Sequence, residues 1–106
     1  DYNKSLPNGY KIHSINLELE FIKNAHGIAV IPDLTMGDVR IPQLGVCGDI
    51  IYGEFFRVGL VQKEYFVIDT RLSNLNTFQS WGEAKIDIQK LLVDPCAIQL
   101  VALEEF

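Results

Sequence analysis

The alternation of apolar and polar residues predicts a strand early in the chain. From residue 15 to residue 21 every second residue is apolar: Ile15, Leu17, Leu19 and Phe21. Successive strand side chains point to opposite faces, so this set should face the core while Glu18 and Glu20 face water. Tyr10 and Ile12 have the opposite parity, and a bulge or bend near residues 13–14 is therefore expected.

Turn-forming residues divide the first half of the chain into short segments. The Leu-Pro-Asn-Gly-Tyr segment at 6–10 predicts a turn followed by a strand, since Asn-Gly tolerates positive φ. Residues 24–27 predict a hairpin loop, and the apolar residues 28–31 predict an interior strand that ends at a proline. Residues 33–48 have little periodicity, and only residues 39–41 predict a short strand there.

Aromatic and β-branched residues predict a hairpin between residues 50 and 70. The apolar residues of its first strand share one parity, which Glu54 interrupts. Residues 62–64 are polar enough to turn the chain, and residues 65–70 predict the return strand. Residues 71–77 then predict a polar loop.

A change of period from two to about 3.6 residues predicts one helix in the C-terminal half of the chain. Ser80 and Glu83 match a capping box, so the helix should begin near Ser80. Its apolar side consists of Trp81, Ala84, Ile88, Leu91 and Leu92. Pro95 ends the helix because the residue before a proline avoids the α region, and residues 97–103 predict a last strand.

The sequence therefore predicts a single α+β domain over residues 1–106. An antiparallel sheet of about five to six strands should be packed by one amphipathic helix. The 106 residues are 48% hydrophobic and 22% charged, which is the composition of an ordinary folded domain. No apolar run approaches the roughly 20 residues that a membrane helix needs, so no membrane span is predicted.

The chain is acidic, with 14 acidic residues against 9 basic ones and a formal net charge of −5. This sign opposes the binding of phosphate backbones, so nucleic acid is not an expected partner. It suits a basic protein partner, because complementary fields speed encounter. Alternatively, the acidity only aids solubility.

The two cysteines, Cys47 and Cys96, lack the close spacing of metal-binding or redox pairs. They either form one disulfide or stay as thiols, and their small or apolar neighbours favour two free, buried thiols. Asp1 in place of Met fits a processed or trimmed N-terminus. The expected compartment is the cytoplasm, or alternatively the periplasm or a lipid-anchored membrane surface if a signal peptide has been removed.

No catalytic motif is present, so an enzyme is not expected. The chain has two histidines and lacks the spacings of zinc sites, nucleophile elbows and phosphate-binding glycine loops. Asp49 and Glu54 are candidates for an acid–base pair, but their spacing places them on opposite faces of a regular strand. No catalytic residue, metal ligand or cofactor site is predicted, and an enzyme assembled from distant carboxylates stays a third alternative.

Glu54 has two interpretations. It would be costly to bury without a partner such as Arg57 or Arg71, so the simpler interpretation is that this part of the strand lies beyond the core edge. An acidic side chain on an aromatic-rich strand is also typical of a binding surface.

The order of several short motifs along the chain gives it a family resemblance. With the turn at 6–10, the His26-Gly27 hairpin, the aromatic strand at 65–69 and the terminal helix, it resembles small bacterial immunity proteins. Such proteins accompany toxins delivered by contact-dependent or type VI systems, and related domains occur in small lipoproteins. The resemblance implies a cognate toxin partner, bound tightly and often through acidic residues.

The expected function is therefore to bind and neutralise a bacterial toxin domain. The alternative is the soluble domain of a small surface protein or lipoprotein with a structural or binding role. The predicted partner-binding residues are acidic side chains outside the core stripes, with two tyrosines as aromatic anchors. They are Glu18, Glu20, Asp49, Glu54 and Asp69, together with Tyr52 and Tyr65.

Overall fold

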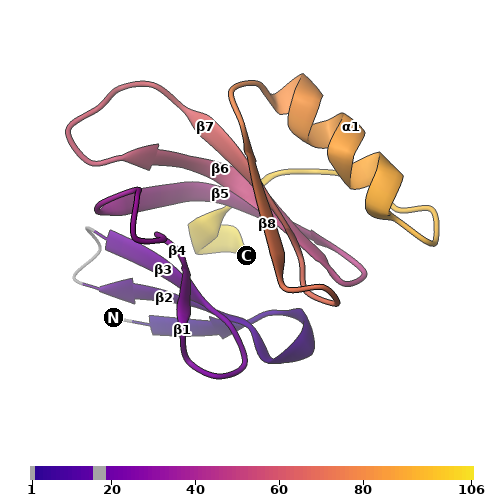
Figure 1. Ribbon diagram of the computed structural model, residues 1–106, viewed down its shortest axis with the longest axis horizontal. Helices are drawn as coiled ribbons and strands as arrows, with labels where there is room; N and C mark the ends of the chain where they lie inside the picture. Colours follow the sequence, from indigo (N-terminus) through magenta and orange to yellow (C-terminus); the bar gives the residue numbers. More distant parts are fainter. Residues whose placement is uncertain (1, 16–18) are drawn as a thin grey trace.

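The computed structural model describes residues 2–15 and 19–106, and it has three layers (Figure 1). One outer layer is a four-stranded antiparallel sheet, here called the N-terminal sheet. Its strands, in spatial order, are β1 (Tyr2–Ser5), β2 (Lys11–Ile15), β3 (Leu19–Lys23) and β4 (Ala29–Ile31). The short 3-10 helix η1 (Pro7–Gly9) connects β1 to β2, where the sequence predicts a turn.

The middle layer is a five-stranded antiparallel sheet, here called the central sheet. Its strands, in spatial order, are β8 (Asn74–Phe78), β7 (Glu64–Asp69), β6 (Ile50–Arg57), β5 (Val39–Cys47) and β9 (Val101–Ala102). The third layer is the helix α1 (Trp81–Leu91), and a second 3-10 helix, η2 (Leu103–Glu105), follows β9. The predicted α+β class, the antiparallel pairing and the helix in the C-terminal half are confirmed, and the strands divide into two sheets.

The helix begins where its cap predicts. The Ser80 hydroxyl accepts a hydrogen bond from the Glu83 backbone N–H at 3.2 Å and donates one to the Glu83 carboxylate at 3.0 Å. Ala84 and Ile88 are fully buried against the central sheet, as the apolar stripe predicts. Among the described residues, no helix is both long enough and apolar enough to cross a membrane.

The central sheet is buried on both faces. In β6, Ile51 and Phe55 contribute to the core between the two sheets, whereas Ile50 and Tyr52 contribute to the core beneath the helix. All of residues 50–55 are buried, so neither parity of this strand faces water. This double burial explains why β6 has apolar residues on both faces rather than a clean alternation.

The predicted single strand over residues 15–21 is wrong. The strands β2 and β3 instead form an antiparallel pair with Ile15 opposite Leu19, and residues 16–18 lie outside the described residues. The even-numbered residues face the core, including Ile12 and Ile22, while Phe21 is only partly buried. The bulge expected near residues 13–14 is also absent from the described part of β2, because its pairing with β3 is regular.

Two other expected segments differ from the structure. Residues 29–31 form an edge strand and not an interior one, because β4 pairs only with β3. The weakly periodic segment 33–48 contains the nine-residue strand β5. Its register shifts between Arg40 and Gln43, so residues of both parities reach the same core and hide the period.

The C-terminal half shows two further corrections. The polar residues 71–77 include most of β8, which pairs with β7 through all five of its residues. In the predicted last strand, only Val101 and Ala102 form a strand, opposite Leu44 and Gln43 of β5. The hairpin of β6 and β7 is confirmed, although its connection spans residues 58–63 and Glu64 already belongs to β7.

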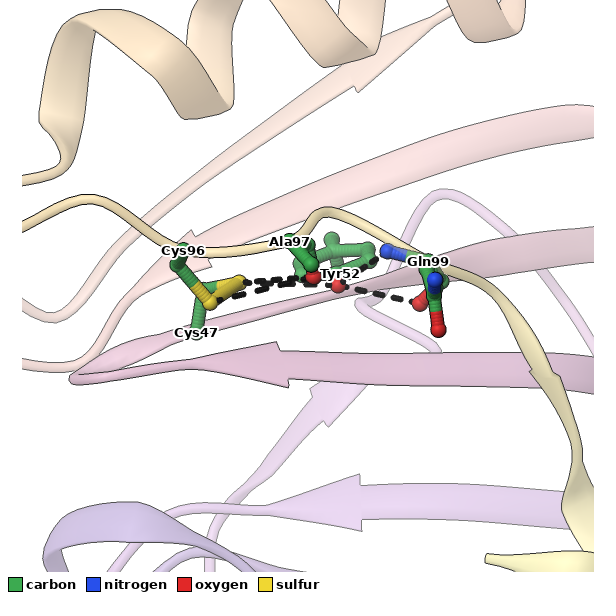
Figure 2. The surroundings of a disulfide bond; sticks show 5 residues. All are labelled: Cys47, Tyr52, Cys96, Ala97 and Gln99. Atoms are coloured by element: carbon green, nitrogen blue, oxygen red, sulfur yellow. Dashed lines mark hydrogen bonds between the residues drawn. A yellow bond between two sulfur atoms is a disulfide. The ribbon is translucent and has the colours of Figure 1, made fainter.

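Cys47 and Cys96 form a disulfide, so the expectation of two free, buried thiols is wrong (Figure 2). The chain leaves α1 and returns alongside β5, which brings together two cysteines 49 positions apart in the sequence. The Tyr52 hydroxyl holds the same returning segment, since it donates to the Gln99 carbonyl and accepts from the Gln99 N–H, both at 3.0 Å. Cys47 is buried, whereas Cys96 is exposed.

Replacing both cysteines by serine should destabilise the protein by about 4 kcal/mol, because the disulfide restricts a long loop of the unfolded chain. Urea denaturation of the Cys47→Ser/Cys96→Ser variant against the oxidised protein measures this difference. Adding a reductant should bring the native protein close to the variant and leave the variant unchanged. Equal stabilities of the variant and the oxidised protein would contradict the expectation.

Candidate partner-binding site

The structure places most of the predicted partner-binding residues in the interior. Glu20, Glu54 and Asp69 are between 1% and 5% exposed, so the expectation that these acidic residues lie outside the core is wrong, and the predicted aromatic anchor Tyr52 is only 1% exposed. Asp49 and Tyr65 are partly exposed, and Glu18 lies outside the described residues. The surroundings of each residue explain its burial.

Glu20 supports the irregular part of β5. Its Oε1 accepts a hydrogen bond from the Ile41 backbone N–H at 2.8 Å and one from Arg40 Nε at 3.3 Å. The carboxylate thus takes the place of a neighbouring strand at this point of β5. Its Oε2 lies 3.3 Å from Arg40 Nε but accepts no hydrogen bond within the described residues.

A cavity of about 650 Å³ lies beside Glu20, between the two sheets. Its polar lining includes Lys4, Ser14, Arg40 and Glu104 as well as Glu20. The Lys4 ammonium donates to the backbone carbonyls of Leu103 and Phe106, at 2.9 and 2.8 Å. Positive and negative groups balance in this cavity, so its charge does not select one class of ligand.

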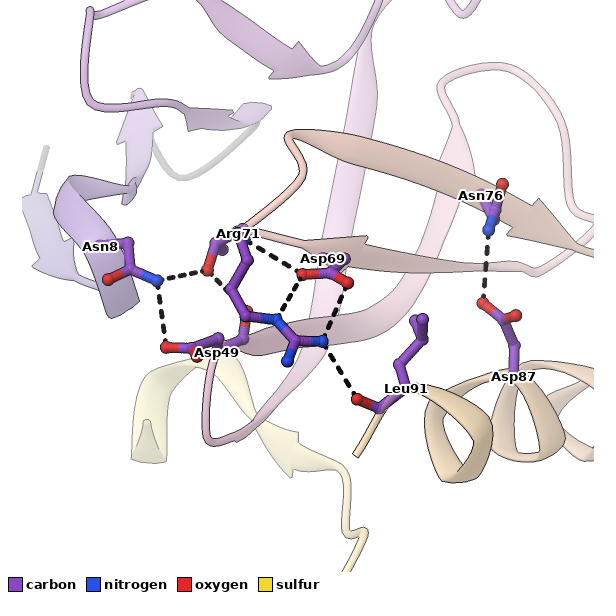
Figure 3. A network of polar contacts seen from close by, with 8 residues as sticks. Asn8, Asp49, Asp69, Arg71, Asn76, Asp87 and Leu91 are labelled. Carbon is purple, nitrogen blue, oxygen red and sulfur yellow. Dashed lines mark hydrogen bonds and ion pairs between the residues drawn. The ribbon is translucent and has the colours of Figure 1, made fainter. Parts of the chain in front are cut away.

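Asp69 and Asp49 belong to a polar network at one end of the central sheet (Figure 3). Arg71 binds Asp69 with two nitrogens, each 3.1 Å from a carboxylate oxygen, and also donates to the Leu91 carbonyl at 3.1 Å. The hydrogen bonds from Arg71 hold the pKa of Asp69 below its usual value. Arg71 therefore links the end of β7 to the end of the helix.

The other half of this network joins the two sheets. Asn8 of η1 donates to Asp49 at 3.0 Å and to the Thr70 hydroxyl at 2.7 Å (Figure 3). The Thr70 hydroxyl in turn donates to the Asp49 carbonyl at 2.7 Å. The structure thus brings two predicted site residues, Asp49 and Asp69, to the same end of the sheet, where both hold layers together.

Glu54 is buried and does not lie beyond the core edge. Its carboxylate lies 3.3 Å from Gln43 Nε2 and 3.8 Å from Lys63 Nζ. Neither expected arginine contacts it, because Arg57 pairs with Glu64 at 2.9 Å and Arg71 pairs with Asp69. The interpretation that Glu54 lies beyond the core edge is therefore wrong, and its basic neighbour is Lys63.

The two tyrosines of the predicted site pack against the first residue of the helix. The rings of Tyr52 and Tyr65 lie 5.9 and 5.8 Å from the Trp81 ring, measured between centroids. Burial raises the pKa of Tyr52 above its usual value. Of these two tyrosines, Tyr52 is buried and Tyr65 is partly exposed.

An exposed apolar surface, which the sequence pattern did not reveal, lies at one end of the molecule. It consists of Leu34 in the loop 32–38, with Val58, Leu60 and Val61 in the loop 58–63; we call these four residues the apolar end. Leu34 and Val61 are 105% and 101% exposed, and the other two are more than half exposed. Figure 1 shows both loops at the same end, and the Val58 N–H donates to the Asp38 carbonyl at 2.9 Å.

Acidic residues adjoin the apolar end. Asp33 and Asp38 flank Leu34 closely in the same loop, and both are exposed. Asp33 accepts hydrogen bonds from the Thr35 hydroxyl and backbone N–H, at 2.7 and 2.9 Å. These bonds lower the pKa of Asp33, so its charge persists in mildly acidic solution.

Comparison with known proteins returned no family model, no curated protein and no solved structure that matches this chain. Within residues 2–15 and 19–106, no group of three or more His, Cys, Asp or Glu side chains is arranged to hold a metal ion.

The Arg71→Gln variant should lose more stability at about pH 7 than at about pH 2.5. Asp69 has a lowered pKa in the folded state, so its ion pair stabilises the protein above the unfolded pKa of about 3.9 and this contribution is lost as the pH falls through the folded value. Thermal unfolding of both proteins at the two pH values measures the gap. A gap that does not change with pH would contradict the expectation.

Asp69→Asn serves as the control for this titration. It has no carboxyl group at this position, so its stability should fall less than that of the native protein between about pH 5 and about pH 2.5.

Proposed function

We propose that this chain is a binding protein that neutralises a cognate bacterial toxin domain, and that the apolar end is its partner surface. The observation that carries the proposal is the full exposure of Leu34 and Val61 on two adjoining loops. Folded proteins rarely leave several large apolar side chains together in water unless a partner covers them. The resemblance to small immunity proteins supplies the class of partner.

The composition of this surface supports a protein partner of basic character. Exposed apolar side chains belong to both loops, and the exposed carboxylates of Asp33 and Asp38 belong to the loop that carries Leu34. An apolar centre with a polar rim is the usual anatomy of a protein interface. The net charge of −5 favours encounter with a basic toxin domain, and this attraction weakens as salt rises.

The disulfide favours the alternative compartment and with it a second candidate function. Disulfides persist in oxidising compartments and are rare in reducing cytosol. We therefore propose that the chain works in the periplasm or at a cell surface, where it could equally be the binding domain of a small lipoprotein. The two functions share the partner surface and differ in the partner.

The test of the proposed function uses the protein encoded beside this chain's gene, since immunity genes lie next to their toxin genes. Its toxin domain should bind this chain with a dissociation constant in the nanomolar range, which calorimetric titration measures, and association should slow as salt rises. A neighbouring protein that does not bind would overturn the immunity role. A salt-independent association rate would contradict the electrostatic part of the proposal.

Substitutions at the apolar end test whether this surface binds the partner, separately from whether the chain binds a toxin at all. Val61→Ser and Leu34→Ser should each weaken binding about 10- to 100-fold, because each removes an apolar side chain that the partner would bury. Val93→Ser is the matched control, since Val93 is 80% exposed but follows the helix. If all three variants bind like the native protein, the partner surface lies elsewhere even though the function stands.

A further inference from the structure

The outer strands of the two sheets differ in how their free edges are protected. On the N-terminal sheet, β4 has three residues and is followed by Pro32, while β1 carries the inward-pointing Lys4. On the central sheet, β9 has only two residues. Short strands, prolines and inward charges are the devices by which proteins prevent edge-to-edge pairing.

The strand β8 has none of these devices. It forms the other edge of the central sheet, beside the helix (Figure 1), and it is five residues long. Residues 72–82, which include β8, contain no charged residue and no proline. Asn74, Asn76 and Thr77 are exposed. Within the described residues, β8 makes backbone hydrogen bonds to β7 and to no other segment, so one row of its N–H and C=O groups faces solvent.

We propose that β8 pairs with β8 of a second copy of this chain, antiparallel and about a two-fold axis through Asn76. This register is the one that pairs all five residues of the strand. Asn76 then lies opposite its own copy, Leu75 lies opposite Thr77, and Asn74 lies opposite Phe78. The two central sheets become one continuous sheet.

The lack of charge on β8 allows a second copy of this acidic chain to approach at this edge. Each chain has a net charge of −5, so two copies repel, and charges of the same sign directly opposite each other destabilise a strand pair. The β8 pairing brings no charged strand residue opposite another. On the helix, the acidic side chain of Asp87 accepts a hydrogen bond from Asn76 at 3.4 Å.

The pairing of β8 with β7 fixes which side chains meet on each face. Phe78 lies opposite Tyr65 and packs into the core beneath the helix, whereas Leu75 lies opposite Ile68 and packs towards the N-terminal sheet. Across the two-fold axis, Phe78 of each copy would lie beside Asn74 of the other copy on the helix side of the joined sheet. Leu75 would lie beside Thr77 of the other copy on the opposite side.

The geometry also sets the size and strength of the assembly. A two-fold contact closes on itself, and the opposite edge of the central sheet is the two-residue β9, so pairing ends at a dimer. The contact involves five strand residues of each copy and is smaller than a standard protein interface. The dimer should therefore be weak, with a dissociation constant of about 10 µM to 1 mM.

Analytical ultracentrifugation of the native protein across this concentration range should show a monomer–dimer equilibrium. Asn76→Asp should weaken dimerisation about tenfold or more, because it places two carboxylates opposite each other beside Asp87. Asn3→Asp is the control, since Asn3 is exposed on β1 and the change in charge is the same. A native protein that stays monomeric throughout, or that assembles beyond a dimer, would overturn the proposal.

A thiol at the axis gives a second, independent readout. The native disulfide leaves no free cysteine, so Asn76→Cys introduces a single reactive thiol. Directly opposite residues of an antiparallel pair are close enough for a disulfide, so this variant should form a covalent dimer on oxidation, whereas Asn3→Cys should not. Equal cross-linking of the two variants would show that β8 is not the contact. Neither experiment involves a toxin, so the outcome is independent of the proposed function.

Discussion

The burial of the central sheet on both faces is the constraint on which the rest of the structure depends. A sheet of this kind needs a cover on each side, and this chain supplies the N-terminal sheet on one side and the helix with its following segment on the other. Polar side chains on such a sheet are buried with it. Glu54, Glu64 and Asp69 therefore each have a basic partner, since an unpaired buried carboxylate would be costly.

The covers are held by polar and covalent links as well as by packing. On the helix side, the disulfide and the Tyr52 hydroxyl bind the segment that follows α1, and Arg71 binds the carbonyl at the helix end. On the other side, Asn8 joins the turn of the N-terminal sheet to Asp49 and Thr70 of the central sheet. All of these links connect residues that are far apart in the sequence, and together they bring the three layers into contact at one end.

This distinction between local and distant contacts explains what the sequence could predict. The helix was predictable because Ser80 and Glu83 interact within one turn, and the hairpin between residues 50 and 70 was predictable because its strands and turn are adjacent in the sequence. The alternation at residues 15–21 is also local, but which parity is buried depends on a distant contact. Glu20 faces inward because Arg40 and the Ile41 N–H bind it there.

The candidate site was predictable only in its general character. Net acidity suggested a binding role, but three of the chosen acidic residues, Glu20, Glu54 and Asp69, proved to be buried and paired with basic side chains. The loop 58–63 escaped notice because Val58 and Leu60 continue the parity of β6, whereas the chain actually turns at Gly59, whose φ is +91°. An apolar run that continues a strand pattern has the same sequence signature as an exposed apolar loop.

The two proposed contacts are compatible in space. The loop 58–63 leads directly into β7, whose Tyr65 lies opposite Phe78, so the apolar end lies at the Phe78 end of β8. A hydrogen bond between Gln62 and Gln79 joins the same two regions. In an antiparallel β8 pair, the two Phe78 ends lie at opposite ends of the shared strands. The two apolar ends then face away from each other, so each copy in a dimer can bind its own partner.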